Sequence, residues 1–470
     1  MAGHIVAADR TERMLLPPTV DEFIGKASAV RVIDAFVSSL DLHALGFARA
    51  HPALTGRPGY EPGMLLRLYI YGYLNQLRSS RRLEKACRIN LELIWLLGWL
   101  APDFKTIADF RRDNHVGITG ACRAFVRFCR DAQLFDGAAV VIDGSKVAAA
   151  ASRKKVRSAA EVAAEVVALD RKIAGYLAAL DVADATEHDD NSDSRTAEAL
   201  KQLKRRRAEL LELAAAMAAE ERELGVLGEL EARPMGSGKG AKRPSYNVQT
   251  AVDPKSHIIV HHDVTTEATD NRLLHPIARA AKAVLGADAL TSIADKGYAN
   301  ASHAAACEAD AITPAVPAPK PTNPRGDFYP PDVFTYDAGS DSYTCPAGRK
   351  LLRHGINERD QAYCYRAETC SGCPLKQDCT TAARRYVYRS MHYEAMQRMT
   401  ARAAQDPTLM KLRRCTVEHP FGTLKQYLGG RFLLRGRLRA ATETALAVLG
   451  YNLGRASRLL GQTELIGRLA

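Results

Sequence analysis

The sequence predicts a mixed α/β protein made of several domains, and three observations support this. Two short apolar runs, residues 140–142 and 293–294, each lead into an aspartate followed by a nearby glycine, as buried strands do where they leave a sheet. Long stretches on either side of these runs show helical spacing of apolar residues instead. The length of 470 residues also exceeds what one compact core usually holds, so two or three domains are expected.

Residues 1–135 are expected to form a helical domain. Apolar residues follow helical spacing at 64–70 and 91–97, and the serines at 79–80 suit a helix N-terminus. Basic residues cluster here: Arg78, Arg81, Arg82, Lys85, Arg88, Arg111, Arg112, Arg123, Arg127 and Arg130. Because neutralised phosphates supply most non-specific affinity for DNA, this module is a candidate DNA-binding domain. The alternative is an ordinary helical bundle with a solvated basic face.

The strands of the predicted core fall in two stretches, residues 136–157 and 233–317. The first contains the run that ends at Asp143. In the second, the pattern predicts a hairpin at 246–252 and 257–264, a helix at 272–285, a strand ending at Asp295, a helix near 301–308 and a strand near 312–316. The expected order is therefore three strands, helix, strand, helix, strand, helix.

Residues 158–232, between these two stretches, are rich in Ala, Glu and Leu. Apolar residues form one helical stripe within 162–180 and a second within 200–217, separated by an acidic, polar stretch at 181–194. This pattern predicts an antiparallel helical hairpin inserted after the first strand. The basic run at 204–207 is expected to form a charged surface patch.

Residues 318–395 have a loop-like composition and hold five of the ten cysteines. The spacing of Cys370 and Cys373 is half of a zinc site, and Cys345 and Cys379 would complete a tetrahedral thiolate set, with Cys364 as a spare ligand. These cysteines are therefore candidate ligands of one structural zinc ion. The alternative is a cysteine-rich insertion whose thiols stay reduced and pack against tyrosines.

The last segment, residues 396–470, contains a predicted helix around Glu418. Arg414 and Lys425 lie 4 residues before and 7 residues after this acid, which places all three on one helical face. Pro420 removes a backbone donor, so the helix is expected to kink there and Lys425 could leave that face.

Asp143, Asp295 and Glu418 each stand at the centre of a separate local motif. Two Mg²⁺ ions about 3.5–4 Å apart can activate an attacking oxygen and stabilise a leaving one at a phosphodiester, and such hard cations require carboxylate oxygens. Taken singly, each acid is more often a turn former. Their combination favours a two-metal site.

With these motifs, the chain resembles the DDE transposases of bacterial insertion sequences. Arg414, Glu418 and Lys425 match the Arg-x3-Glu-x6-Lys motif of one group in this family, although Lys411 stands where that group often has tyrosine. Further similarity extends through residues 57–60, 79–84 and 246–253. The resemblance implies a ribonuclease-H-like mixed sheet core, with residues 396–470 as its C-terminal part.

The resemblance also implies a function and its site residues. The protein would bind double-stranded DNA at the terminal repeats of its element, cleave a strand, and join the freed end to target DNA, as a homodimer on DNA. Asp143, Asp295 and Glu418 would bind two Mg²⁺ or Mn²⁺ ions. Candidate DNA contacts are Arg414, Lys425, Lys146, Lys296, Arg81 and Arg82. The alternatives are a nuclease or resolvase on the same fold, or a DNA-binding repressor that has lost catalysis.

The composition limits the partners and the compartment. A formal net charge of +12 favours a polyanionic partner. The sequence contains no run of about 20 apolar residues and no signal-peptide pattern, so no membrane association is expected. We therefore expect a cytoplasmic protein, whose cysteines are thiols or metal ligands instead of disulfides.

Overall fold

A computed structural model of the chain describes residues 19–50, 59–184, 190–236, 242–319 and 328–470. The chain divides into two compact units. The first consists of residues 1–125 together with 452–470, and the second of residues 126–451. Each unit is described separately below.

The first unit is helical, as its apolar spacing predicted. Its elements are η1 (Val20–Phe23), α1 (Ala29–Ser38), α2 (Pro62–Leu74), α3 (Ser80–Ile89), α4 (Leu91–Leu96), α5 (Phe104–Asp113), most of α6 (His115–Asp131), the end of α13 (Arg437–Leu460) and α14 (Gln462–Leu469). Helix α2 is buried along most of its length, and its Tyr69 hydroxyl donates to the Ile107 carbonyl at 2.7 Å. Helix α14 packs against α1. Residues 452–470 therefore group with the helical unit, although the sequence suggested that they belong to the core.

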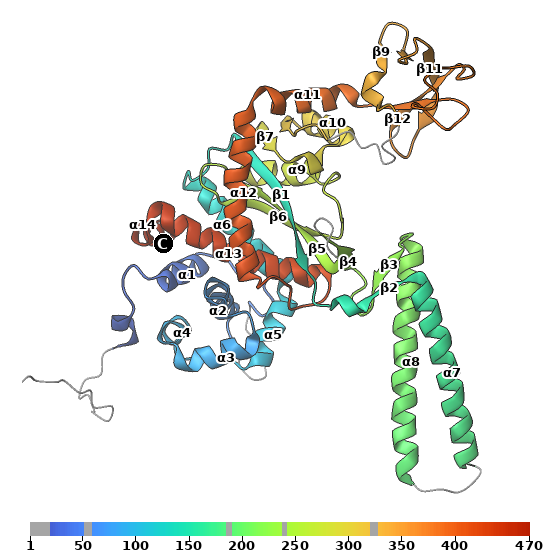
Figure 1. Cartoon of the computed structure of the whole chain (residues 1–470). Helices are drawn as coiled ribbons and strands as arrows, with labels where there is room; N and C mark the ends of the chain where they lie inside the picture. The colour runs from blue at the N-terminus through green and yellow to red at the C-terminus, as the bar shows by residue number, and fades with distance from the viewer. Residues whose placement is uncertain (1–18, 51–58, 185–189, 237–241, 320–327) are drawn as a thin grey trace, which may run out of the picture. The chain divides into compact units, whose positions relative to one another are not determined.

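The second unit contains a six-stranded sheet (Figure 1). Its strands are β1 (Ala139–Ala148), β4 (Arg233–Met235), β5 (Arg243–Val252), β6 (Ile259–Thr265), β7 (Leu290–Ile293) and β8 (Ile312–Ala315). The order is β4-β5-β1-β7-β8, with β6 also paired to β5. The pairs of β5 are antiparallel, whereas β1, β7 and β8 run parallel to one another. With α9 (Leu274–Leu285) and α10 (Ala301–Ala309) between them, these strands follow the predicted element order, except that the short strand β4 is added before β5.

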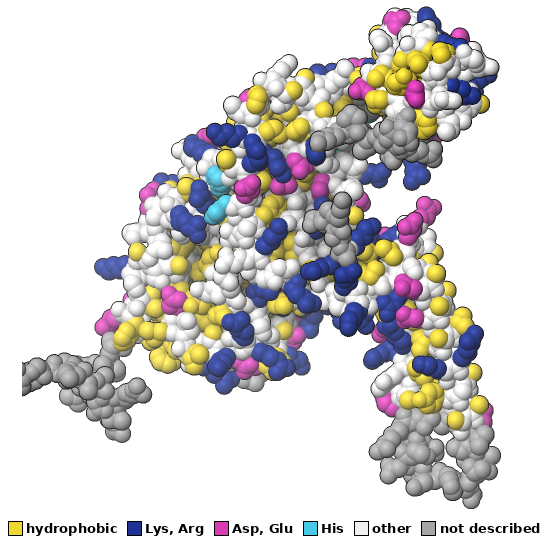
Figure 2. Space-filling model, in the orientation of Figure 1, with side chains coloured by type: hydrophobic (Ala, Val, Ile, Leu, Met, Phe, Trp, Pro, Cys, Tyr) yellow, Lys and Arg dark blue, Asp and Glu magenta, His cyan; other side chains and the backbone are white. Residues whose placement is uncertain are grey.

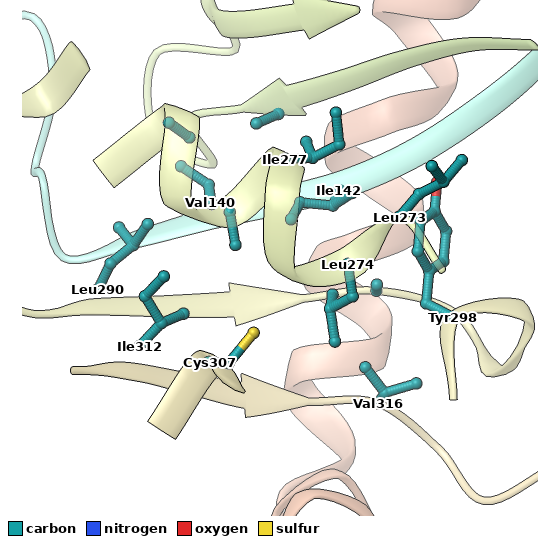
Figure 3. Close-up of a cluster of buried hydrophobic side chains, with 14 of the residues drawn as sticks. Val140, Ile142, Leu273, Leu274, Ile277, Leu290, Tyr298, Cys307, Ile312 and Val316 are labelled. Atoms are coloured by element: carbon teal, nitrogen blue, oxygen red, sulfur yellow. The ribbon is translucent and has the colours of Figure 1, made fainter. Parts of the chain in front are cut away.

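One face of this sheet carries the main apolar core. Val140 and Ile142 of β1 face α9, α10 and α11 (Tyr393–Gln405), as Figure 3 shows for the first two helices. The other core members labelled there are Leu273, Leu274, Ile277, Leu290, Tyr298, Cys307, Ile312 and Val316. Because side chains alternate along a strand, Val141 and Asp143 point to the opposite face. Helix α12 (Pro407–Tyr427) contacts β1 and β7.

Strand β1 continues past Asp143, although a glycine turn was predicted at this point. The antiparallel pairing with β5 extends from Val141 to Ala148, and the parallel pairing with β7 ends at Val141. Gly144 stays in the strand, where it pairs with Gln249 of β5. A Cβ at position 144 would stand 2.2 Å from Gln249 Nε2. This glycine therefore makes room for a neighbouring strand instead of forming a turn.

The predicted helical hairpin consists of α7 (Ala159–Asp184) and α8 (Asp190–Ala219), which lie side by side (Figure 1). Helix α8 begins inside the acidic stretch that was expected to separate the helices. Short strands β2 (Val156–Ser158) and β3 (Leu224–Val226) pair at the open end. Arg206 and Arg207 of the predicted basic patch form ion pairs with Glu165 and Asp170 of α7, so this part of the patch joins the two helices.

The cysteine-rich segment forms a five-stranded antiparallel sheet, whereas its composition suggested loops. Its strands are β9 (Thr335–Asp337), β10 (Ser342–Thr344), β11 (Lys350–Asn357), β12 (Ala362–Ala367) and β13 (Tyr386–Ser390). They are joined by turns, and the small core consists of Phe334, Tyr343, Leu351, Tyr365, Ala367 and Val387. Strands β9 and β10 have three residues each, and β11 is exposed along most of its length, so these strands leave only a weak alternating pattern in the sequence.

Candidate active site

Asp143 and Asp295 come together at the sheet, on strands that are direct neighbours. Asp143 lies two residues beyond the end of the pairing between β1 and β7, and Asp295 lies two residues after β7. The Nη2 atom of Arg413, on α12, is 2.9 Å from Asp143 Oδ2 and 3.5 Å from Asp295 Oδ2. Both oxygens are within 3.5 Å of one nitrogen, so their separation is at most twice that distance. Asp143 therefore lies within β1, and Asp295 lies just beyond the end of the neighbouring strand β7.

The electrostatics of this pair are set by burial and by one cation. Burial raises the pKa of Asp143, the positive charge of Arg413 and the Gly144 N–H lower it, and the charge of Asp295 raises it again. The N–H groups of Gly144 and Gly297 donate to Asp143 Oδ1 and Asp295 Oδ1, each at 2.8 Å. One Oδ1 on each residue is therefore held by its own backbone, while the Oδ2 atoms face the guanidinium.

Glu418, Arg414 and Lys425 lie on α12, and all three side chains are exposed. The helix runs without interruption through Pro420. Across the described residues, no three His, Cys, Asp or Glu side chains stand close enough together to hold a metal ion. The structure thus brings Asp143 and Asp295 together without adding Glu418 as a third ligand. Carboxylates without a bound cation repel one another, and an exposed glutamate favours water.

A largely buried polar network, which the sequence analysis did not predict, lies beside Asp143. Asp270 accepts hydrogen bonds from Lys146 Nζ at 2.9 Å, Asn247 Nδ2 at 2.7 Å and Gln249 Nε2 at 2.9 Å. Gln249 Oε1 in turn accepts from the Tyr298 hydroxyl. Burial and the nearby carboxylates raise the pKa of Tyr298 well above its ordinary value, so it remains a neutral donor. The only available signal was that Asn247 and Gln249 are polar at alternate positions of a strand.

The other predicted DNA contacts differ in their accessibility. Lys296, next to Asp295, is exposed. Lys146 is instead mostly buried in its ion pair with Asp270. In the first unit, Arg81 and Arg82 are exposed on α3, and the Arg81 guanidinium lies 4.6 Å from the centre of the Phe104 ring. Over α12 and β1, Figure 2 shows acidic side chains surrounded by Lys and Arg.

Four of the cysteines in the small sheet are neighbours. Burial raises the pKa of the Cys379 thiol, Arg385 lowers it, and the nearby Cys370, Cys345 and Cys373 raise it further. Cys345 Sγ accepts the N–H of Arg349 at 3.3 Å, and Cys370 Sγ accepts the N–H of Arg385 at 3.4 Å.

Cys364 differs from these four cysteines. It is buried in β12, where it pairs with Tyr388 of β13. Its place in the strand ladder argues against its predicted use as a spare ligand.

Two family models match the chain, and together they span most of it. Residues 18–113 match a transposase domain (DUF772), and residues 221–453 match a transposase DDE domain. Comparison with curated proteins and with solved structures found no match. These families function in transposition, with DNA as the substrate, and include enzymes that cleave and transfer DNA and typically use divalent metal ions. None of the helices in the described residues has the length and apolar character needed to cross a membrane. The chain belongs to the DDE transposases of insertion sequences.

Proposed function

We propose that this transposase binds the terminal repeats of its element, cuts a DNA strand there with water, and uses the freed 3′-hydroxyl to attack target DNA. Asp143, Asp295 and Glu418 are the proposed catalytic residues. The observation that carries this proposal is the meeting of Asp143 and Asp295 on adjacent parallel strands, around one positive charge. Two carboxylates so close together are costly unless a cation balances them.

The residues present fit divalent metal ions. The donor set consists of carboxylate oxygens, which Mg²⁺ and Mn²⁺ prefer, and the guanidinium of Arg413 already occupies a cation position between two of them. Asp143 and Asp295 would hold the ions, with Glu418 reaching in from α12. Bound ions would supply nucleophile activation and charge stabilisation at the phosphodiester. The backbone N–H groups of Gly144 and Gly297 keep each aspartate oriented.

The sheet also supports a ribonuclease-H-like core. Its first three long strands, β1, β5 and β6, are antiparallel neighbours, and β7 and β8 extend the sheet in parallel on the other side of β1. Asp143 lies in the central strand β1, where the strand ladder limits its movement, and Asp295 follows the neighbouring strand β7 and accepts the Gly297 N–H.

DNA contacts are proposed on both units. Arg81 and Arg82 would contact phosphates from α3, while Arg414, Lys425 and Lys296 would do so near the aspartates, since all five are exposed. Lys146 is engaged by Asp270 and would have to release that partner first. Two element ends must meet in one reaction, so a homodimer on DNA remains part of the proposal.

The test of DNA binding uses the full chain, because residues 452–470 belong to the same compact unit as α3. Replacing Arg81 and Arg82 together with Gln should weaken binding to terminal DNA and reduce its salt dependence, because fewer counterions would be released. Equal affinity and an equal salt slope in the double variant and the parent would remove these residues from the interface.

We also propose that Cys345, Cys370, Cys373 and Cys379 bind one structural zinc ion. Their sulfurs are close enough to influence one another, and two accept backbone N–H groups, which suits thiolates. In the described residues the four thiols do not form a metal-holding group, so zinc binding would require their side chains to move closer together.

Cleavage of terminal DNA in Mg²⁺ tests the main proposal. Asp143→Asn, Asp295→Asn and Glu418→Gln should each abolish strand cleavage while DNA binding persists, because each removes a proposed metal ligand without changing the basic surfaces. Near-normal cutting by any one variant would exclude that residue. Products that join donor and target DNA would separate a transposase from a nuclease or resolvase, and binding without any cleavage would support a repressor.

A further inference from the structure

Arg413 is the one side chain that contacts both aspartates in the described structure. It lies on α12 immediately before Arg414, and only 19% of its side-chain surface is exposed. Its Nη2 atom reaches Oδ2 of Asp143 and Oδ2 of Asp295, while its buried Nε has no hydrogen-bond partner in the described parts of the chain. The guanidinium is thus drawn into this position by the two carboxylates, although one of its own donors remains unsatisfied.

We infer that Arg413 is an internal counter-ion, which holds the place of a metal between Asp143 and Asp295 and must leave when a divalent ion binds. This inference rests on the proposed function, since it assumes that the aspartates are metal ligands. A divalent ion binds carboxylate oxygens at about 2.0–2.2 Å and needs lone pairs that face it. The Oδ2 lone pairs already face the guanidinium, and a second cation at the same oxygens would meet strong repulsion from the first.

This role makes a prediction that separates Arg413 from a positioning residue. A counter-ion that competes with metal weakens metal binding, so its removal should increase affinity. A residue that only orients the carboxylates would support metal binding, so its removal should leave affinity unchanged or reduce it. Lys411 provides a matched control, because it lies two residues before Arg413 on the same helix and has the same charge, but its side chain is exposed.

The test is the direct titration of Mn²⁺ into the full-length protein without DNA. Binding is measured by calorimetry or by the electron spin resonance signal of free Mn²⁺. We expect Arg413→Gln to bind Mn²⁺ at least about tenfold more tightly than the parent, since a full charge at contact distance is removed. Lys411→Gln should stay within about twofold, because an exposed charge is screened by solvent. Adding Asp143→Asn should abolish the tight site in every background, which identifies it as the aspartate site.

Equal or weaker Mn²⁺ binding by Arg413→Gln, with an Asp143-dependent site still present in the parent, would overturn the counter-ion role and leave the metal site standing. If neither protein shows Asp143-dependent binding, the proposed metal site fails and the counter-ion role fails with it. Arg413→Met removes the same charge but keeps an aliphatic stem. It replaces Arg413→Gln in the Mn²⁺ titration if the Gln variant does not fold. The thermal shift caused by Mn²⁺ should also be larger in either neutral variant than in the parent.

Discussion

The aspartate pair and the cysteine cluster are both gatherings of metal-ligand side chains, but the protein supports them differently. Asp143 and Asp295 belong to a six-stranded sheet with a large apolar core, and Arg413 balances their charge. The cysteines lie in turns of a five-stranded sheet whose apolar core cluster has six buried members among the described residues. A site on a large core keeps its shape without a ligand, whereas a small domain depends on one for stability. Metal should therefore be optional for folding at the first site and required at the second.

The largest expected effect is the loss of structure in the small sheet when zinc is removed. Structural zinc contributes about 10–16 kcal/mol in small zinc domains. Treatment with a strong chelator should release about one zinc per chain and open residues 328–390 to proteolysis, while residues 139–148 stay protected. Zinc analysis and mass spectrometry of the fragments measure both results. Protein without zinc, or cleavage that begins in both sheets, would contradict the comparison.

A smaller effect is expected from Asp270→Ala, which removes the common acceptor of Lys146, Asn247 and Gln249. Three partly or fully buried donors would lose this acceptor, so the free energy of unfolding should fall by about 3 kcal/mol. Urea unfolding measures this change. Asp288→Ala removes an exposed carboxylate from a loop and should change stability by less than about 0.5 kcal/mol. A similar value for both variants would show that the network does not stabilise the sheet.

Gly144→Ala tests how closely the strands beside Asp143 are packed. The added Cβ would stand 2.2 Å from Gln249 Nε2 and 2.9 Å from Asp270 Oδ1, so hydrogen bonds of the network must shift. We expect a loss of about 2 kcal/mol, as for other overpacked sites. Gly422→Ala, on an exposed part of α12 with no atom within 4 Å of the new Cβ, should instead stabilise the protein by about 0.5–1 kcal/mol. Unfolding curves of the two variants should therefore move in opposite directions.

The smallest effect is expected from Cys364→Ser, which sharpens the assignment of the zinc ligands. Cys364 is buried in β12 and pairs with Tyr388, away from the turns that carry the other four cysteines. The variant should retain its zinc and lose only about 1 kcal/mol, because a small buried group becomes more polar. Cys373→Ser should lose the zinc. Loss of zinc from the Cys364 variant would return this cysteine to the ligand set.

Local sequence pattern was sufficient for most elements of the second unit. The hairpin of β5 and β6, helices α9 and α10, and strands β7 and β8 lie where alternation and helical spacing predicted them. The apolar runs before Asp143 and Asp295 were also predicted correctly as strands, and they correspond to β1 and β7. The sequence pattern predicted a turn at Gly144, and this prediction was wrong. A glycine in a strand and a glycine in a turn cannot be distinguished by local sequence until the neighbouring strand is known.

By itself, the sequence determined the order of the elements and the transposase family, and it singled out the acids and cysteines proposed as ligands, because each depends on residues close together in the chain. Only the tertiary structure decided which charges meet. Arg413 reaches Asp143 and Asp295 from a helix far along the chain, and Asp270 gathers donors from two strands. Residues 452–470 likewise return to the helical unit. Such contacts depend on how distant segments pack, and no local pattern of residues encodes the partner of a charge across a fold.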